Sequence, residues 1–168
     1  MKTIILPGYS PHNKDWAEKV AKNLKTRTKD EIVVHNWQHW QSGSFSIKRE
    51  LKKIGQEMGD GKVNIIAKSV GTRVVVSLLT SLPNRINKLI LCGIPTVSED
   101  AKKIYSEGLS KIDNSKIVCF QNTKDPFATA DEVREFIGSV NKKIKVVEKP
   151  RSDHDYSYFE DFVKFFKA

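Results

Sequence analysis

The stretch Val63-Asn64-Ile65-Ile66-Ala67-Lys68-Ser69-Val70-Gly71-Thr72-Arg73-Val74-Val75-Val76 decides the fold of this chain. A short apolar run reaches Ser69, which stands between the small residues Ala67 and Gly71, and a helical pattern then begins. A strained turn from strand to helix needs small residues two positions on either side of the serine, because larger ones would collide with the backbone. The pattern predicts a nucleophile elbow. A serine that merely caps the next helix is the alternative.

Short apolar runs alternate with helical patterns along the whole chain. Because the runs are apolar on both faces, they predict a parallel sheet that is covered by helices on both sides. We expect one α/β domain over residues 1–168, built as a three-layer α/β/α sandwich. The expected strands are 2–6, 32–35, 63–68, 88–92, 116–120 and 144–147, and the expected helices lie near 13–24, 46–58, 70–82, 97–109, 133–140 and 156–166.

The composition narrows the class of protein. The net charge of +9 comes from lysines and arginines that are scattered along the chain, which favours a solvated surface over a nucleic-acid site. No apolar run is long enough to cross a membrane, and the one at the start is too short for a signal peptide. Cys92 and Cys119 end apolar runs, so we expect them to be buried and free in a reducing, cytoplasmic setting. No metal-ligand spacing, P-loop or dinucleotide fingerprint occurs, so we expect no metal site and neither of these nucleotide-binding motifs.

Polar residues follow the expected strands at the edge where ligands bind in parallel sheets. Asp125 follows the fifth strand and His154 follows the sixth. The chain order Ser69, Asp125, His154 is the one expected of a serine hydrolase on this architecture. In that interpretation Ser69 is the nucleophile, His154 the general base and then acid, and Asp125 the group that orients His154. The backbone N–H groups of Val70 and Tyr9 would stabilise the oxyanion.

Each of these residues also has a simpler interpretation. Asp125 precedes a proline and fits an ordinary turn, and His154 could be a solvated loop residue. Its neighbours Asp153 and Asp155 are expected to cap the last helix. His12 and His35 have no evident partners. The aromatic loop with Trp37, His39 and Trp40 would either border the site or pack against a helix.

With these motifs in place, the chain resembles the α/β-hydrolase fold family, and specifically its compact members without a lid, such as the small serine hydrolases of the retinoblastoma-binding type. The resemblance rests on Ile5-Leu6-Pro7-Gly8-Tyr9 with Trp16 downstream, on Ala67-Lys68-Ser69-Val70-Gly71, and on Asp125 and His154-Asp155. Pro7 replaces a common histidine, and Ala67 replaces a common glycine. The resemblance implies a minimal α/β-hydrolase fold with six parallel strands in the order 2-1-3-4-5-6, no lid insertion, an acyl-serine intermediate, no cofactor and a shallow, open pocket.

We therefore expect a cytoplasmic serine hydrolase that acts on small carboxylic esters, with amides and thioesters as related substrates. Gly8, Tyr9 and Lys68 are the expected substrate-binding residues. Lys68 would bias the site toward anionic groups, and a surface lysine is the alternative for this residue. The alternative function is a catalytically weak binding or scaffolding domain of the same fold with an anionic partner.

Overall fold

A parallel sheet of six strands forms the middle layer of the computed structural model, which describes all residues from Met1 to Ala168. The strands follow the order β2-β1-β3-β4-β5-β6, and each neighbouring pair is parallel. This order confirms the expected topology. The strands are β1 (Lys2–Leu6), β2 (Glu31–Val34), β3 (Val63–Lys68), β4 (Ile86–Cys92), β5 (Ile117–Asn122) and β6 (Lys145–Lys149).

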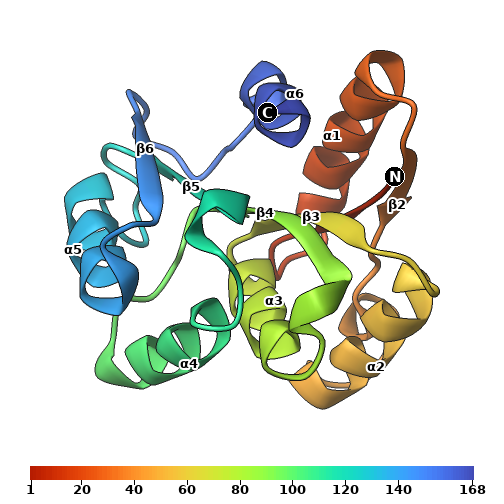
Figure 1. The fold of residues 1–168 in the computed structure, drawn as a ribbon, viewed down its shortest axis with the longest axis horizontal. Helices are drawn as coiled ribbons and strands as arrows, with labels where there is room; N and C mark the ends of the chain where they lie inside the picture. The colour runs from red at the N-terminus through yellow and green to blue at the C-terminus, as the bar shows by residue number, and fades with distance from the viewer.

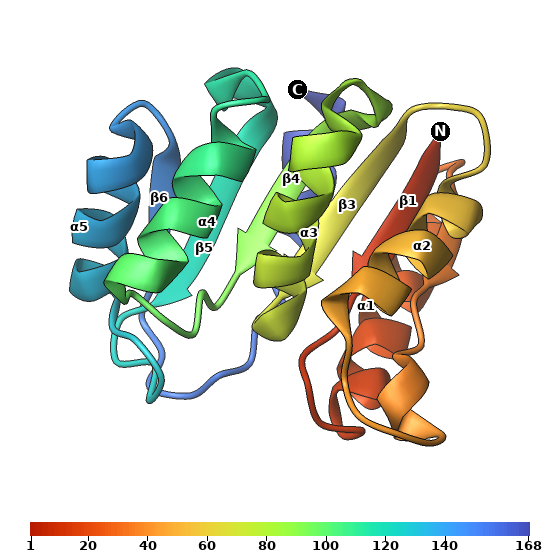
Figure 2. The same ribbon diagram turned by 90° about the horizontal axis from the view of Figure 1, so that it is seen from below.

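Helices cover both faces of the sheet. Figure 2 shows α2, α3, α4 and α5 side by side on one face, and Figure 1 shows α1 and α6 on the other. The expected three-layer sandwich is thus confirmed. None of the helices combines the length and apolar character needed to cross a membrane. Their bounds are α1 (Asn13–Arg27), α2 (Ile47–Met58), α3 (Val70–Ser81), α4 (Glu99–Leu109), α5 (Ala130–Asn141) and α6 (Phe159–Lys167).

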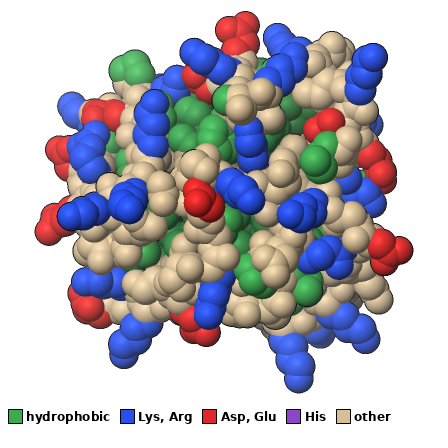
Figure 3. All heavy atoms as spheres, viewed as in Figure 1, with side chains coloured by type: hydrophobic (Ala, Val, Ile, Leu, Met, Phe, Trp, Pro, Cys, Tyr) green, Lys and Arg blue, Asp and Glu red, His purple; other side chains and the backbone are tan.

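The central strands are apolar on both faces because each face packs against helices. In β3, Ile65 and Ala67 belong to the larger core under α2 to α5, whereas Ile66 belongs to the second core under α1 and α6. Cys92 and Cys119 are buried and free, as predicted. Most charged groups lie at the surface: on the face shown in Figure 3, lysines and arginines are dispersed among acidic and uncharged side chains. Glu50, Lys68 and Asp125 are buried exceptions.

Several predicted boundaries were wrong at the strand ends. β5 continues to Asn122 instead of ending at Phe120, because Gln121 and Asn122 are buried and pair with β6. The last helix begins at Phe159, so Tyr156 lies in the loop before it. The capping prediction for the two aspartates of that loop is also wrong, since no side chain caps α6.

His35 has two partners that sequence reasoning did not find. Its ring is fully buried at the end of β2, where Nε2 lies 2.9 Å from Glu50 Oε2 and Nδ1 lies 2.7 Å from Glu57 Oε2. Glu50 also accepts a hydrogen bond from the backbone N–H of Gln38. A buried, hydrogen-bonded polar cluster of this kind contributes little net stability, but removing one partner leaves the others unsatisfied.

Replacing His35 with alanine should lower the free energy of unfolding by about 3 kcal/mol, because two carboxylates would lose their shared partner. Urea unfolding at neutral pH measures this loss. His12→Ala is the matched control, since His12 is exposed and its loss should stay within about 0.5 kcal/mol. Equal stability of the His35→Ala variant and the wild type would contradict the structural role of the cluster.

Candidate active site

Ser69 occupies a strained turn between β3 and α3. Its φ of 54° makes it the one non-glycine residue with positive φ. The backbone N–H of Ser69 donates to the carbonyl of Cys92 (2.9 Å), and its carbonyl accepts from both the N–H and the hydroxyl of Thr72. The Ser69 side chain makes no helix-capping hydrogen bond. A positive φ of this kind costs about 1–3 kcal/mol, and the hydrogen bonds around Ser69 hold its backbone in this conformation. The Ser69 hydroxyl takes no part in them.

Gly71 is small because α3 begins directly against the end of β1. A Cβ atom at Gly71 would lie 2.6 Å from the carbonyl oxygen of Leu6, which is far inside van der Waals contact. Ala67, two residues before Ser69, is fully buried in the core. Gly71 thus has the steric reason that the sequence pattern suggested, and Ala67 lies where the core leaves little space for a larger side chain.

His154 and Asp125 meet at the carboxyl edge of the sheet. Nδ1 of His154 lies 2.6 Å from Oδ2 of Asp125, and Asp125 also accepts from the Tyr156 hydroxyl (2.6 Å) and the Phe127 N–H (2.9 Å). Burial alone opposes ionisation of Asp125, but the three hydrogen bonds outweigh it and hold its pKa below the ordinary value. Nε2 of His154 is buried and has no partner, so no hydrogen bond joins it to Ser69.

The loop that carries His154 is fixed from β5. Asn122, the last residue of that strand, donates from its side chain to the carbonyls of Asp153 (2.8 Å) and Asp155 (2.9 Å). Its backbone N–H donates to the Tyr156 hydroxyl (3.1 Å). Asn122 and Tyr156 were both missed as site residues. A polar residue that ends a buried strand was the available signal for Asn122, whereas Tyr156 fitted the aromatic spacing of the following helix.

Gly93 brings the end of β4 close to the same histidine. Its φ is 61°, and a Cβ atom here would lie 2.7 Å from Cε1 of His154 and 2.5 Å from the ring of Tyr156. The preceding residue, Cys92, accepts the hydrogen bond from the Ser69 N–H. The end of β4 therefore contacts both candidate residues: Cys92 accepts a hydrogen bond from Ser69, and Gly93 lies against the ring of His154.

The turn after β1 is held by the aromatic loop that follows β2. The indole N–H of Trp37 donates to the carbonyl of Gly8 (3.0 Å), and that of Trp40 donates to the carbonyl of Tyr9 (2.8 Å). Nε2 of His39 also lies 2.8 Å from the Tyr9 carbonyl. The sequence left two alternatives for this loop: its aromatic residues border the site or pack inside the protein. Trp37 packs inside, because its side chain is fully buried.

The two expected oxyanion donors are backbone groups with no acceptor of their own. The N–H of Tyr9 donates to no atom of the chain. Val70 is the first residue of α3, where N–H groups have no intrahelical acceptor. The start of a helix also presents a positive dipole end to its surroundings.

Lys68 is buried and belongs to a polar network under α1. Only 6% of its surface is exposed, so the surface-lysine alternative is wrong. Nζ donates to Oδ1 of Asn13 (2.8 Å) and lies 5.2 Å from the centre of the Trp16 ring. Burial, opposed by nearby carboxylates, lowers the pKa of Lys68. Asn13 in turn packs against Gly8, where a Cβ atom would lie 2.6 Å from Oδ1 of Asn13. The network thus supports the turn after β1.

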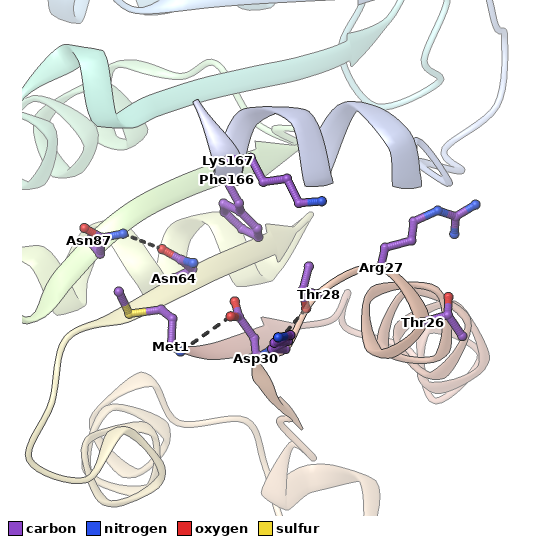
Figure 4. Close-up of a pocket in the computed structure, with 10 residues that line it drawn as sticks. Met1, Thr26, Arg27, Thr28, Asp30, Asn64, Asn87, Phe166 and Lys167 are labelled. Atoms are coloured by element: carbon purple, nitrogen blue, oxygen red, sulfur yellow. Dashed lines mark hydrogen bonds and ion pairs between the residues drawn. The ribbon is translucent and has the colours of Figure 1, made fainter.

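Other features lie apart from this edge. A cavity of about 580 Å³ opens at the amino ends of the strands, where Met1, Asp30, Asn64 and Phe166 line it (Figure 4). Asn87 donates to Asn64 there (2.9 Å), and the terminal amine pairs with Asp30. No three His, Cys, Asp or Glu side chains are arranged to hold a metal ion.

Comparisons with known proteins agree with this fold. Residues 12–161 match the family model described as an alpha/beta hydrolase domain. The ydeN gene product of B. subtilis is 13% identical, with all of both chains covered and a TM-score of 0.70. The pyrethroid hydrolase PytH is 11% identical over 100% of this chain and 98% of that chain, with a TM-score of 0.71. XC6422 from Xanthomonas campestris, described as an α/β serine hydrolase without a lid, is 16% identical over 97% of this chain and 77% of that chain, with a TM-score of 0.70. No curated protein matches the chain.

The lowered pKa of Asp125 predicts a pH-dependent contribution to stability. Because the folded pKa lies below the value of 3.8 for an unperturbed carboxyl, ionised Asp125 stabilises the fold above that pH, and the contribution disappears as the pH falls through the folded pKa. Urea unfolding of the wild type and Asp125→Asn between pH 7 and pH ~2.5 measures it, and the comparison cancels the other carboxylates. The wild type should lose stability relative to the variant in acid. A difference that is constant with pH would show that the hydrogen bonds to Asp125 do not favour its ionised form.

Proposed function

Because the chain belongs to the alpha/beta hydrolase domain family, we propose that it is a serine hydrolase that cleaves small carboxylic esters, with amides and thioesters as related substrates. The observation that carries the proposal is the 2.6 Å hydrogen bond between His154 Nδ1 and buried Asp125, at the sheet edge where Ser69 stands in a strained turn. A carboxylate bound at Nδ1 leaves Nε2 to exchange a proton with a nucleophile. Nε2 of His154 has no hydrogen-bond partner in the chain.

In the proposed acylation step, Oγ of Ser69 attacks the carbonyl carbon of the ester while Nε2 of His154 removes the hydroxyl proton. The carbon–oxygen bond to the alcohol then breaks, and the imidazolium returns the same proton to the leaving oxygen. Water attacks the acyl-serine in the second step with His154 again as the base, which releases the acid and restores Ser69. Asp125 keeps the imidazole in the required tautomer throughout.

The tetrahedral intermediates would be stabilised by the N–H groups of Val70 and Tyr9. Loss of one such donor typically lowers the rate by ~100-fold or more. The hydrogen bonds from Trp37 and Trp40 to the turn after β1 support this role, because an oxyanion donor must be held in place before the reaction.

Gly8, Tyr9 and Lys68 remain the proposed substrate-binding residues. Gly8 and Tyr9 belong to the turn that would receive the ester carbonyl. Since Nζ of Lys68 is bound to Asn13, its charge would act on an anionic substrate through its field and not by direct contact.

The alternative is a binding or scaffolding domain of the same fold, and the absence of a hydrogen bond between His154 and Ser69 would fit it. The other features of the site favour the hydrolase. A binding domain has no need of a strained serine, a carboxylate buried beneath a histidine, or two backbone donors without acceptors. Groups of this kind concentrate at catalytic sites.

Replacing Ser69 with alanine should abolish labelling by a fluorophosphonate probe and lower the hydrolysis of p-nitrophenyl acetate by at least ~1000-fold, because no nucleophile remains. Mass spectrometry of the labelled wild type should locate the adduct on Ser69. Ser77→Ala is the matched control, since Ser77 lies on the same helix and its hydroxyl bonds to the Arg73 carbonyl. If Ser69→Ala labels and turns over as the wild type does in folded protein, the proposed mechanism is wrong.

A further inference from the structure

Two large aromatic side chains are exposed at the candidate active edge. Only Met1, Tyr9 and Phe127 combine a large apolar side chain with high exposure, at 58%, 55% and 63%. Met1 lies at the amino edge, whereas Tyr9 follows β1 and Phe127 follows β5. Single exposed apolar residues need no explanation, but two rings in turns beside candidate catalytic groups suggest a contact with the substrate.

Of the two rings, Phe127 has the more open surface. The Tyr9 ring stacks on His39 with a centroid distance of 4.4 Å and meets the edge of Phe45. The Phe127 ring has one aromatic neighbour, His154, at a centroid distance of 4.6 Å. The backbone N–H of Phe127 donates to Oδ1 of Asp125, which fixes the residue relative to the catalytic pair. Phe127 therefore presents an exposed apolar ring next to the imidazole, on a backbone that is hydrogen-bonded to Asp125.

The position beside His154 indicates which part of a substrate would meet this ring. The imidazolium gives its proton to the leaving oxygen, so that oxygen must come within about 3 Å of Nε2. The carbon atoms attached to it then extend from the imidazole toward its neighbours, of which the Phe127 ring is one. The acyl group lies on the other side of the scissile bond, toward the oxyanion donors.

We propose that Phe127 determines specificity for the leaving group, and that the protein prefers esters of aromatic alcohols to esters of small alkyl alcohols. This inference rests on the proposed function. An aromatic ring on the alcohol would stack on the open face of Phe127 or meet it edge-on, as aromatic pairs do. A contact of that kind changes a rate constant by about 2- to 10-fold.

Benzyl acetate and ethyl acetate test the proposal because both give the same acetyl-Ser69. Deacylation is then common to the two esters, and kcat/KM reports only the steps in which the alcohol is still present. The wild type should have the higher kcat/KM for benzyl acetate. Phe127→Ala should lower the benzyl-to-ethyl ratio of kcat/KM by about 5-fold, while Phe127→Leu, which keeps an apolar surface, should give an intermediate ratio.

Phe166→Ala is the matched control, because Phe166 lines the cavity at the opposite edge and its loss should leave the ratio unchanged. Thermal unfolding checks that each variant is folded. An equal loss for both esters in Phe127→Ala would overturn the proposal, since the ring would then act through His154 alone. Labelling of Ser69 by a fluorophosphonate without a benzyl preference overturns the specificity and leaves the hydrolase mechanism standing. If neither ester is cleaved and Ser69 is not labelled, both proposals fail.

Discussion

The contact between Gly71 and the carbonyl oxygen of Leu6 is the constraint on which the candidate site depends. Because no Cβ atom fits between them, α3 can begin directly at the end of β1. This approach brings the first turn of α3 against Leu6, the last residue of β1, and the turn that carries Tyr9 follows Leu6 in the chain. Ser69, which precedes the helix, has a positive φ, and the resulting strain is offset by hydrogen bonds to Cys92 and Thr72 and by the burial of α3. One close backbone contact thus fixes where α3 begins, next to the proposed nucleophile Ser69 and the proposed oxyanion donor Val70.

The sequence predicted the parts of this arrangement that have local causes. Apolar runs without alternation identified buried parallel strands, because both faces of β3 and β4 pack against helices. The small residues around Ser69 identified the turn, since their size is a steric requirement of the backbone there. Asp125 and His154 could be found because each lies in the loop after a strand, and parallel strands end at one edge of the sheet.

The parts that could not be predicted depend on contacts between residues far apart in the chain. Lys68 looked like a surface lysine because a charged residue at a strand end usually is one, and only the packing of α1 over it shows otherwise. Tyr156 fitted the helical spacing of the aromatic residues after it, yet its hydroxyl is used by Asp125 and by the backbone of Asn122. His35 could not be paired either, since the two glutamates that hold it come from a helix that begins after the aromatic loop.

The two edges of the sheet show why volume is a poor guide to the site in a protein of this size. The amino edge has the cavity of about 580 Å³, but its polar groups satisfy one another, as Asn64 and Asn87 do. The carboxyl edge holds the groups that the fold leaves unsatisfied or strained: the Nε2 atom of His154, the N–H of Tyr9 and the backbone of Ser69. Chemistry requires such groups, because a catalytic atom must be free to bind the substrate. In the proposed reaction a substrate would be held by the side chains that project at this edge, and the exposed ring of Phe127 is one of them.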